Sequence, residues 1–133
     1  MWCQGSRISR RHRRINERIN ELKKGKDRTG EINPFELKQM ENLLLSSKHS
    51  AIKDANTYII TVPTPVDGEN RPDMGSVLAA TKSVATVLKS GNFVIYESTV
   101  YPGATDEECI PLLEKTSNKA INKDFFVPKY LIK

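Results

Sequence analysis

The sequence predicts an α/β fold with a parallel sheet of the nucleotide-binding type. Two runs of β-branched and aromatic residues, 57–62 and the start of 93–100, lack the alternation of half-exposed strands, so both are expected to be covered on both faces. A helical pattern follows each run, and a third strand pattern comes at 124–127. Strands that alternate with helices over 133 residues favour βαβ units in one domain.

The chain begins its periodic part with a short amphipathic helix at 15–24. Ile15, Ile19 and Leu22 recur at i, i+4 and i+7 with polar residues between them, which places them on one helix face. Gly25 follows and is expected to end this helix.

A second helix is predicted to start after Asn33. Asn33 is a favoured N-cap, Pro34 takes the first helical position and Glu36 the third. The apolar face of this helix would consist of four residues: Leu37, Met40, Leu43 and Leu44. A short strand at 44–46 is also expected.

The first strand of the sheet, 57–62, is predicted to stop at Pro63, and 63–72 is a loop rich in proline and polar residues. Asp73 then caps a helix that Gly91 terminates. The apolar face of this helix is predicted to consist of Val77, Ala80, Val84, Val87 and Leu88.

The second strand becomes polar at 97–99 and leads into a loop at 101–104. Thr105 and Glu108 have the spacing of a capping box and predict the start of the last helix. Three residues are expected to point inward from it: Ile110, Leu112 and Leu113.

The positive charge is concentrated in residues 1–28, which hold seven Arg and three Lys against three acidic residues, a net charge of +7. The other 105 residues therefore carry −2 of the total of +5. Such a basic arm could bind nucleic acid through phosphate contacts. It has Trp2 but no series of aromatic residues for base stacking, so a solvated tail is the favoured interpretation.

Composition and cysteine usage exclude several classes. The longest apolar runs are far shorter than the roughly 20 residues of a spanning helix, and residues 1–14 lack the apolar stretch of a secretion signal. Cys3 and Cys109 are the only thiols, which is too few for a disulfide framework or a four-ligand zinc site. A cytoplasmic location is expected.

Two strand ends carry the candidate site, because ligands of parallel sheets bind where the strands end. Thr64 stands between prolines after the first strand, and Ser98 with Thr99 follows the second. Their hydroxyls suit a phosphate, a ribose or a catalytic water. The alternative is that Thr64 is a turn residue and that Ser98 and Thr99 only bind backbone groups.

Other candidate groups are given structural roles. A lone Glu97 could be a general base but is more often paired structurally. Cys109 next to Ile110 is expected to be a small buried residue and not a nucleophile. His12 and His49 have no companions at ligand spacing, so neither a metal nor a catalytic role is assigned to them.

Two segments carry a family resemblance. Residues 54–65, DANTYIITVPTP, and 97–105, ESTVYPGAT, resemble the UDP-glucose/GDP-mannose dehydrogenase family. The second form is similar to the branch that oxidises UDP-N-acetylhexosamines in Vi-antigen and O-antigen synthesis. The resemblance extends over 15–127 and implies a partial Rossmann-type, doubly wound parallel sheet whose first strand and Gly-rich turn are missing.

This resemblance implies an NAD cofactor and a UDP-sugar substrate, whose C6 alcohol the family oxidises to a carboxylate. By position, Arg18 would approach the adenosine ribose, and Val62, Pro63 and Thr64 would contact the cofactor. Ser98 would also contact the cofactor. Thr99 would lie near the nicotinamide and help to hold the catalytic water.

The ends of the chain depart from the family pattern. Residues 1–14 form a basic tail that does not resemble the family, and 128–133 diverge where a Gly-Tyr-Ser-Pro-Glu segment is expected. The family's dimerisation helix and nucleophilic Cys have no counterpart in this sequence. We expect a fragment that is inactive alone. The alternative is a small non-enzymatic interaction module whose basic arm binds nucleic acid or a protein partner.

Overall fold

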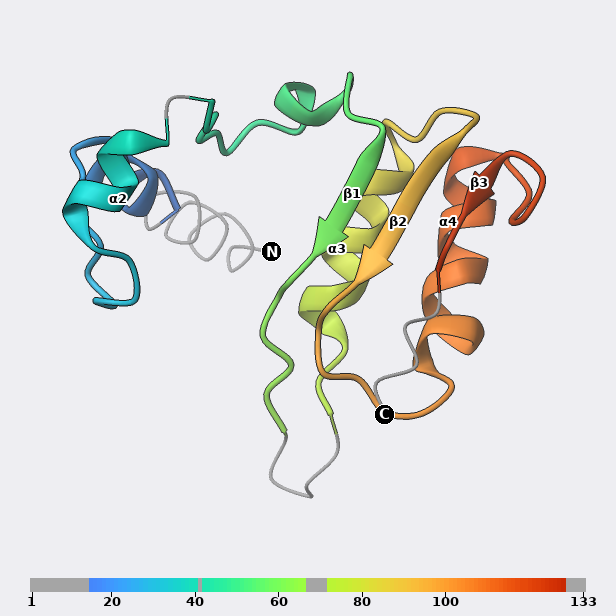
Figure 1. The fold of residues 1–133 in the computed structure, drawn as a ribbon. Helices are drawn as coiled ribbons and strands as arrows, with labels where there is room; N and C mark the ends of the chain where they lie inside the picture. Colours follow the sequence, from blue (N-terminus) through green and yellow to red (C-terminus); the bar gives the residue numbers. More distant parts are fainter. Residues whose placement is uncertain (1–14, 41, 67–71, 129–133) are drawn as a thin grey trace, which may run out of the picture. The chain divides into compact units, whose positions relative to one another are not determined.

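Residues 15–40, 42–66 and 72–128 are described by the computed structural model of this chain. They belong to two units that divide between Ala51 and Ile52. Figure 1 shows the elements of each unit along the chain, with a short 3₁₀ turn at His49–Ile52. Within the described residues, no helix has the length and apolar character needed to cross a membrane.

The first unit contains the two predicted helices, and the second helix is shorter than predicted. Residues 15–23 are helical, and Gly25 has a φ of +74°, which confirms its role at the helix end. Helix α2 (Pro34–Gln39) starts as expected, with the Asn33 side chain accepting the Phe35 N–H at 2.9 Å.

The predicted apolar face of this second helix is wrong beyond its first residue. Leu37 is buried, but the helix ends at Gln39 and Leu44 is 74% exposed. A helix of six residues makes few internal hydrogen bonds, and among the described residues of the unit Leu37 is the one buried large apolar side chain. The strand expected at 44–46 is also wrong, because these described residues form no ladder.

The second unit is built on a three-stranded parallel sheet in the order β1-β2-β3. Strand β1 (Thr57–Ile60) pairs with β2 (Asn92–Tyr96), and β2 pairs with β3 (Phe125–Phe126). The predicted α/β class with parallel strands is confirmed.

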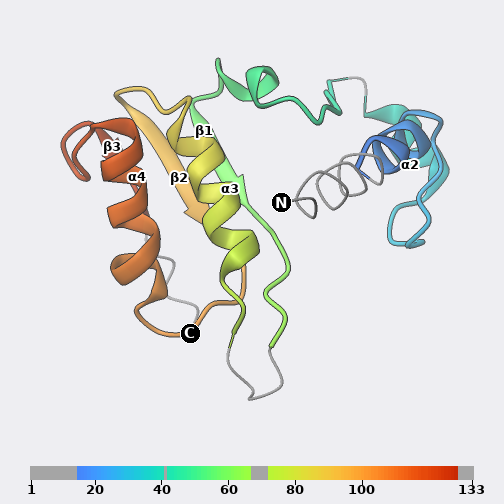
Figure 2. The same ribbon diagram turned by 180° about the vertical axis from the view of Figure 1, so that it is seen from behind.

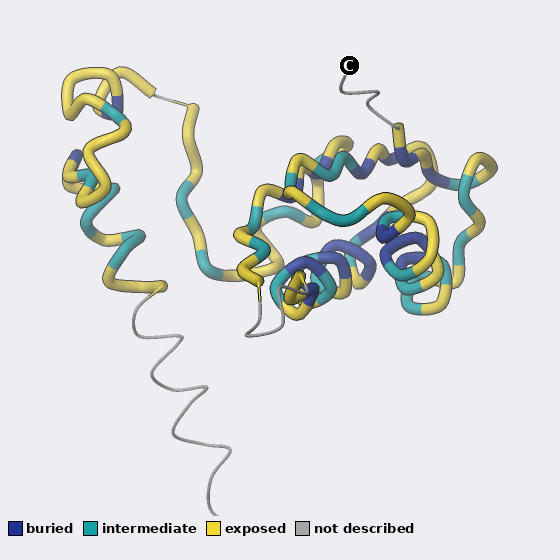
Figure 3. Tube along the Cα trace, turned by 90° about the horizontal axis from the view of Figure 1, so that it is seen from below, coloured by how far each residue is buried: buried dark blue, intermediate teal, exposed yellow. Residues whose placement is uncertain are grey.

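Helices α3 (Gly75–Ala85) and α4 (Ile110–Ser117) lie on the same face of this sheet, as Figures 1 and 2 show. The main core lies between the helices and the strands, where Figure 3 shows the buried segments. Its ten buried members are Tyr58, Ile60, Val84, Ala85, Leu88, Val94, Ile110, Leu113, Phe125 and Val127.

The other face of the sheet is exposed, which corrects the expectation that both faces are covered. Ile59 is 60% exposed and Phe93 is 40% exposed, and the Phe93 and Phe126 rings stack at 5.3 Å on this face. Burial in β1 alternates along the strand. The physical reason is that α3 and α4 both pack on one side.

Helix α3 confirms only part of its prediction, because it ends at Ala85 instead of at Gly91 and its N-cap residue is Met74. The Asp73 carboxylate accepts the Gly75 N–H at 2.8 Å at its start, and Val77, Val84 and Leu88 are buried. Gly91 lies beyond the end of the helix, directly before β2, where its φ of +87° is a left-handed conformation that suits glycine.

The capping box predicted at Thr105 and Glu108 is wrong. Thr105 lies inside a π-helical turn (Thr105–Cys109) whose start has no side-chain cap, and the Ile110 N–H reaches back to the Thr105 carbonyl. Pro111, which follows, has no N–H, and its ring would crowd the carbonyl four residues earlier in an α-helix. The wide turn accommodates Pro111 in the first turn of α4.

Candidate functional site

The loops that follow β1 and β2 meet at the carboxyl edge of the sheet. The Val62 N–H donates to the Ser98 hydroxyl oxygen at 2.9 Å, and that hydroxyl is 3.4 Å from the Ile60 carbonyl. Parallel neighbours end at the same edge of a sheet, so two segments 36 residues apart in sequence become one surface.

A second cross-link joins the same two loops one step further out. The Thr64 hydroxyl donates to the carbonyl of Thr99. Pro63 lies between the two cross-linked positions and fixes its own φ. The sequence-predicted residues Val62, Thr64, Ser98 and Thr99 are therefore brought together. The Ser98 hydroxyl binds backbone groups, as the alternative interpretation expected, and the Thr64 hydroxyl, which that interpretation placed in a turn, binds the Thr99 carbonyl.

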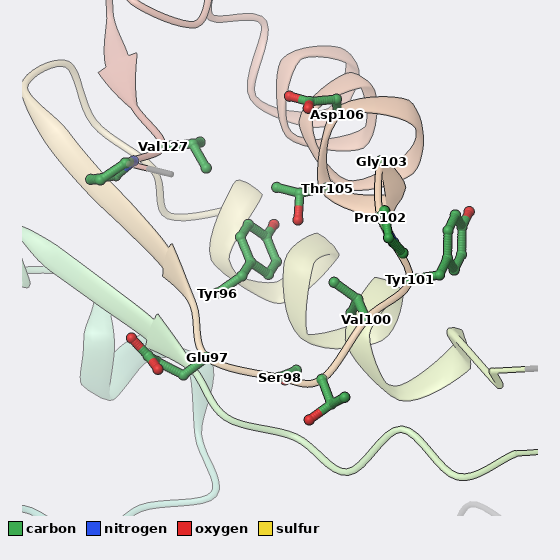
Figure 4. A pocket seen from close by; sticks show the side chains of 12 residues that line it. Tyr96, Glu97, Ser98, Val100, Tyr101, Pro102, Gly103, Thr105, Asp106 and Val127 are labelled. Atoms are coloured by element: carbon green, nitrogen blue, oxygen red, sulfur yellow. The ribbon is translucent and has the colours of Figure 1, made fainter. Parts of the chain in front are cut away.

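A cavity of about 380 Å³ lies beside these loops and is shown in Figure 4. It is lined by residues 96–103, by Thr105 and Asp106, and by Val127 and Pro128. The lining combines hydroxyl groups with the two carboxylates of Glu97 and Asp106, and none of these described lining residues is Lys or Arg. The described walls of the cavity therefore combine apolar surface with hydroxyl and carboxylate groups.

Glu97 differs from its expected structural pairing. It is exposed, its N–H donates to the Ile60 carbonyl at 3.0 Å, and its carboxylate has no hydrogen bond or ion pair within the described parts of the chain. In Figure 4 the side chains of Tyr96 and Glu97 point to opposite sides of the strand end. The Glu97 carboxylate is thus free to meet a ligand or solvent.

The sequence did not predict a buried polar cluster of Thr81, Tyr96 and Cys109, in which Tyr96 also lines the cavity. The hydroxyls of Thr81 and Tyr96 are 2.9 Å apart, and the Cys109 thiol interacts with both. Burial raises the pKa of Tyr96 and of Cys109, so both stay protonated near neutral pH. The expectation that Cys109 is a small buried residue is confirmed, since it is fully buried.

The position of Thr81 gives a signal for this cluster. Thr81 lies four residues after Val77 and three before Val84, so it interrupts the apolar face of a helix. A polar residue on such a face needs a buried partner, although the sequence does not identify Tyr96 as that partner.

Tyr101 joins the loop at 101–104, which lines the cavity, to the π-helical turn that follows it. Its hydroxyl donates to the Glu108 carboxylate, and this bond raises the pKa of Tyr101 to about 12. Gly103, with a φ of +93°, leaves room for Glu107, whose Oε1 would be 2.8 Å from an added Cβ. The loop therefore requires glycine at this position.

Arg18 lies in the first unit and already has protein partners. Its guanidinium donates to the Asp27 carboxylate and, at 3.5 Å, to the Thr29 hydroxyl. The Asp27 carboxylate also accepts the N–H groups of Thr29, Glu31 and Ile32 at 3.0–3.1 Å. The contact predicted between Arg18 and the adenosine ribose stays a prediction.

Metal binding has no support among the described residues, where no group of three or more His, Cys, Asp or Glu could hold an ion. The parallel sheet and the hydroxyl-lined cavity at its carboxyl edge instead define the class of α/β proteins that bind nucleotides at strand ends.

Comparison with known proteins identifies the family. Residues 15–129 match the NAD binding domain of the UDP-glucose/GDP-mannose dehydrogenase family. The chain therefore belongs to the UDP-glucose/GDP-mannose dehydrogenase family, and the part that it contains corresponds to the domain that binds NAD.

The similar proteins include enzymes of several bacteria and archaea. The chain is 47% identical over 109 residues to UDP-N-acetyl-D-glucosamine 6-dehydrogenase of Pseudomonas aeruginosa, covering 82% of this chain and 26% of that protein. It is 49% identical to protein CapL of Staphylococcus aureus, covering 85% and 27%. It thus spans about a quarter of the length of these relatives.

Solved structures show the same fold. UDP-D-ManNAc dehydrogenase of Pyrococcus horikoshii is similar with a TM-score of 0.75 at 30% identity, covering 87% of this chain and 29% of that one. A ternary complex of GDP-mannose dehydrogenase of Pseudomonas aeruginosa also gives 0.75, at 25% identity, covering 84% and 27%. The Rossmann-type fold class is confirmed.

Proposed function

We propose that this chain supplies part of the NAD site of a nucleotide-sugar 6-dehydrogenase. The enzyme would oxidise the C6 alcohol of a UDP-N-acetylhexosamine to a uronate for polysaccharide synthesis in the cytoplasm. The observation that carries this proposal is the pair of hydroxyl-bearing loops, cross-linked through Val62–Ser98 and Thr64–Thr99, beside a cavity at the carboxyl edge of the sheet. It is supported by the match to an NAD binding domain.

The chemistry of the cavity fits the nicotinamide riboside end of NAD better than its pyrophosphate. Hydroxyl groups of Ser98, Thr99 and Thr105 and the carboxylates of Glu97 and Asp106 line it, without Lys or Arg among the described lining residues. Ribose hydroxyls and a carboxamide bind such groups well, and the oxidised nicotinamide ring carries a positive charge. A phosphate would be repelled by the Glu97 carboxylate, which makes no ion pair within the described parts of the chain.

The residues have different roles in this proposal. NAD, when bound, accepts a hydride from the sugar carbon. Thr99 is exposed at the cavity, and its hydroxyl would hold the catalytic water near the reacting carbon. Val62, Pro63 and Ser98 would form the wall against which the cofactor lies, and Arg18 would serve the adenosine end.

A chimera tests this proposal. Residues 52–127 of this chain would replace the matching segment of the Pseudomonas aeruginosa UDP-N-acetyl-D-glucosamine 6-dehydrogenase, which is 47% identical. The measurement is NADH formation from NAD and UDP-N-acetyl-D-glucosamine. We expect the chimera to form NADH, and a folded chimera that binds neither NAD nor the sugar nucleotide would contradict the proposal.

Variants of the same chimera separate the roles. Thr99→Val should lower kcat by about one hundredfold, the effect of losing one well-placed hydrogen-bonding group. Thr61→Val is the matched control, because Thr61 is exposed and its side chain makes no hydrogen bond within the described residues. Equal rates for both variants would remove Thr99 from the catalytic site.

The alternative function, an interaction module with a basic arm, is not favoured by a specific observation. Residues 1–14 lie outside the described residues. Arg18 and Arg28 of the remaining arm are bound to Asp27 and Glu21, so much of their charge is balanced within the unit. Tight DNA binding by the whole chain that weakens steeply with salt would revive this alternative.

A further inference from the structure

We infer that Thr64 is a positioning residue that sets the backbone of Thr99, and not primarily a cofactor contact. The inference deepens the proposed function and rests on it for the importance of Thr99. The geometry that carries it is the hydrogen bond from the Thr64 hydroxyl to the Thr99 carbonyl, between loops 35 residues apart in sequence.

The backbone position of Thr99 depends on this bond because Thr99 lies beyond the hydrogen-bonded ladder of the sheet. Strand β2 ends at Tyr96, and the last ladder-like contact of this loop is the bond from the Glu97 N–H to the Ile60 carbonyl. Ser98 is anchored through its hydroxyl at the next position. The carbonyl of Thr99 then receives its hydrogen bond from Thr64.

Thr64 is well suited to hold another residue because its own backbone is restricted. Pro63 and Pro65 flank it. Each proline has a fixed φ, and a residue before proline is confined to extended conformations. The segment is therefore stiff, and the direction of the Thr64 hydroxyl is largely set before any ligand arrives.

The donor inventory separates the two possible roles of Thr64. A threonine hydroxyl has one hydrogen to donate and two acceptor positions. Its hydrogen is directed to the Thr99 carbonyl, so only the acceptor positions are left for a ligand. Thr64 can therefore not donate to a phosphate while it holds Thr99.

The test uses the full chain labelled for NMR and NAD as the probe. Two readouts are followed: the carbonyl ¹³C resonance of Thr99 and the dissociation constant for NAD. Thr64→Val removes the hydroxyl at constant shape, Thr64→Ser retains it, and Thr61→Val is the control. Unchanged resonances of β1 and β2 show that each variant is folded.

We expect Thr64→Val to move the Thr99 carbonyl resonance and to weaken NAD binding by about three- to tenfold, as for one lost hydrogen bond. Thr64→Ser should restore both, and Thr61→Val should change neither. A loss of NAD affinity with an unmoved Thr99 resonance would overturn the inference in favour of a direct contact. Unchanged values of both readouts in Thr64→Val would overturn it as well.

Failure of the proposed function gives a different result. If the unsubstituted chain does not bind NAD, NAD binding by this chain is refuted. The Thr99 carbonyl resonance in Thr64→Val still decides the positioning role, since a shift supports it and no shift overturns it.

Discussion

The two units of this chain are stabilised by different physics. In the described part of the first unit, Leu37 is the one buried large apolar side chain. The Asp27 carboxylate accepts hydrogen bonds from the Arg18 side chain and from three backbone N–H groups of the same unit. In the second unit, two apolar clusters underlie the sheet and the candidate site. The site-bearing loops therefore stand on a hydrophobic core, whereas the unit with Arg18 depends on charge.

This difference determines which perturbation affects which unit. Apolar burial is insensitive to pH and scales with the area removed from water. A carboxylate network depends on the ionised state of one group. Substitutions and pH changes should therefore affect the stability of the two units separately.

The largest effect is expected from Phe125→Ala in the second unit. Phe125 of β3 is fully buried in the main core, and removing such a ring costs about 3–5 kcal/mol of unfolding free energy. Urea unfolding followed by circular dichroism measures it. Leu44→Ala, at a position 74% exposed in the first unit, should stay within about 0.5 kcal/mol. Similar costs for the two variants would contradict the comparison.

As the pH falls, the first unit should lose stability at a higher pH than the second unit. The Arg18 guanidinium, aided by Thr29, holds the pKa of Asp27 well below its ordinary value of 3.8. The unfolded chain therefore binds a proton more readily, so the Asp27 contribution is complete above about pH 4 and is lost as the pH falls below it. Amide exchange at Thr29, Glu31 and Ile32 should accelerate in that range.

Asp27→Asn is the matching variant for this acid effect. The amide keeps the shape of the side chain but cannot form the ion pair with Arg18, so exchange at the three amides should be fast at every pH. Exchange in β2 should not change. If the amides of β2 responded to acid together with those of the first unit, the two units would share one source of stability.

Alanine substitution of two glycines should have an effect on stability between those of the other variants. Gly30 and Gly91 have φ values of +70° and +87°, and an added Cβ would meet nothing within 4 Å at either position. Alanine at each should cost about 1–2 kcal/mol through the left-handed conformation alone. Gly91→Ala should lower the urea midpoint of the sheet, and Gly30→Ala should accelerate exchange only in the first unit. A lower sheet midpoint in Gly30→Ala would break the comparison.

The smallest effect is expected for Tyr96→Phe. This variant leaves the Thr81 hydroxyl without its 2.9 Å partner in a buried position, which should cost about 0.5–1.5 kcal/mol. Urea unfolding measures the loss, and Thr81→Val with Tyr96→Phe in one chain should recover part of it. A double variant as unstable as the sum of both singles would show that the pair does not act as a unit.

Local chemistry made much of the second unit predictable. Pro63 follows the end of β1 and Asp73 precedes the start of α3, as rules that involve only neighbouring residues predict, although β1 ends at Ile60 and α3 at Ala85, both earlier than predicted. The same rules explain why Asn33 starts α2 correctly. The two hydroxyl-bearing strand ends were also predicted, because parallel strands must finish at one edge.

The wrong predictions concern features that depend on contacts between residues far apart in the sequence. The apolar strand β1 predicted two covered faces, yet both helices pack on one side and Ile59 is exposed. Glu108 has the spacing of a capping partner for Thr105, but the Tyr101 hydroxyl binds it instead. The Thr64–Thr99 bond was likewise invisible in the sequence, since it joins two separate loops.

The most direct test of the account is an NMR titration of the full labelled chain with NAD. We expect shift changes in the loop at 62–64, the cavity segment at 97–106 and residues 127–128, and at Arg18 if it binds the adenosine end, with the resonances of Phe35 and Leu44 unmoved. Shift changes that centre on the exposed face of Ile59 and Phe93, or no changes at all, would contradict the claim that the carboxyl edge of this sheet is an NAD site.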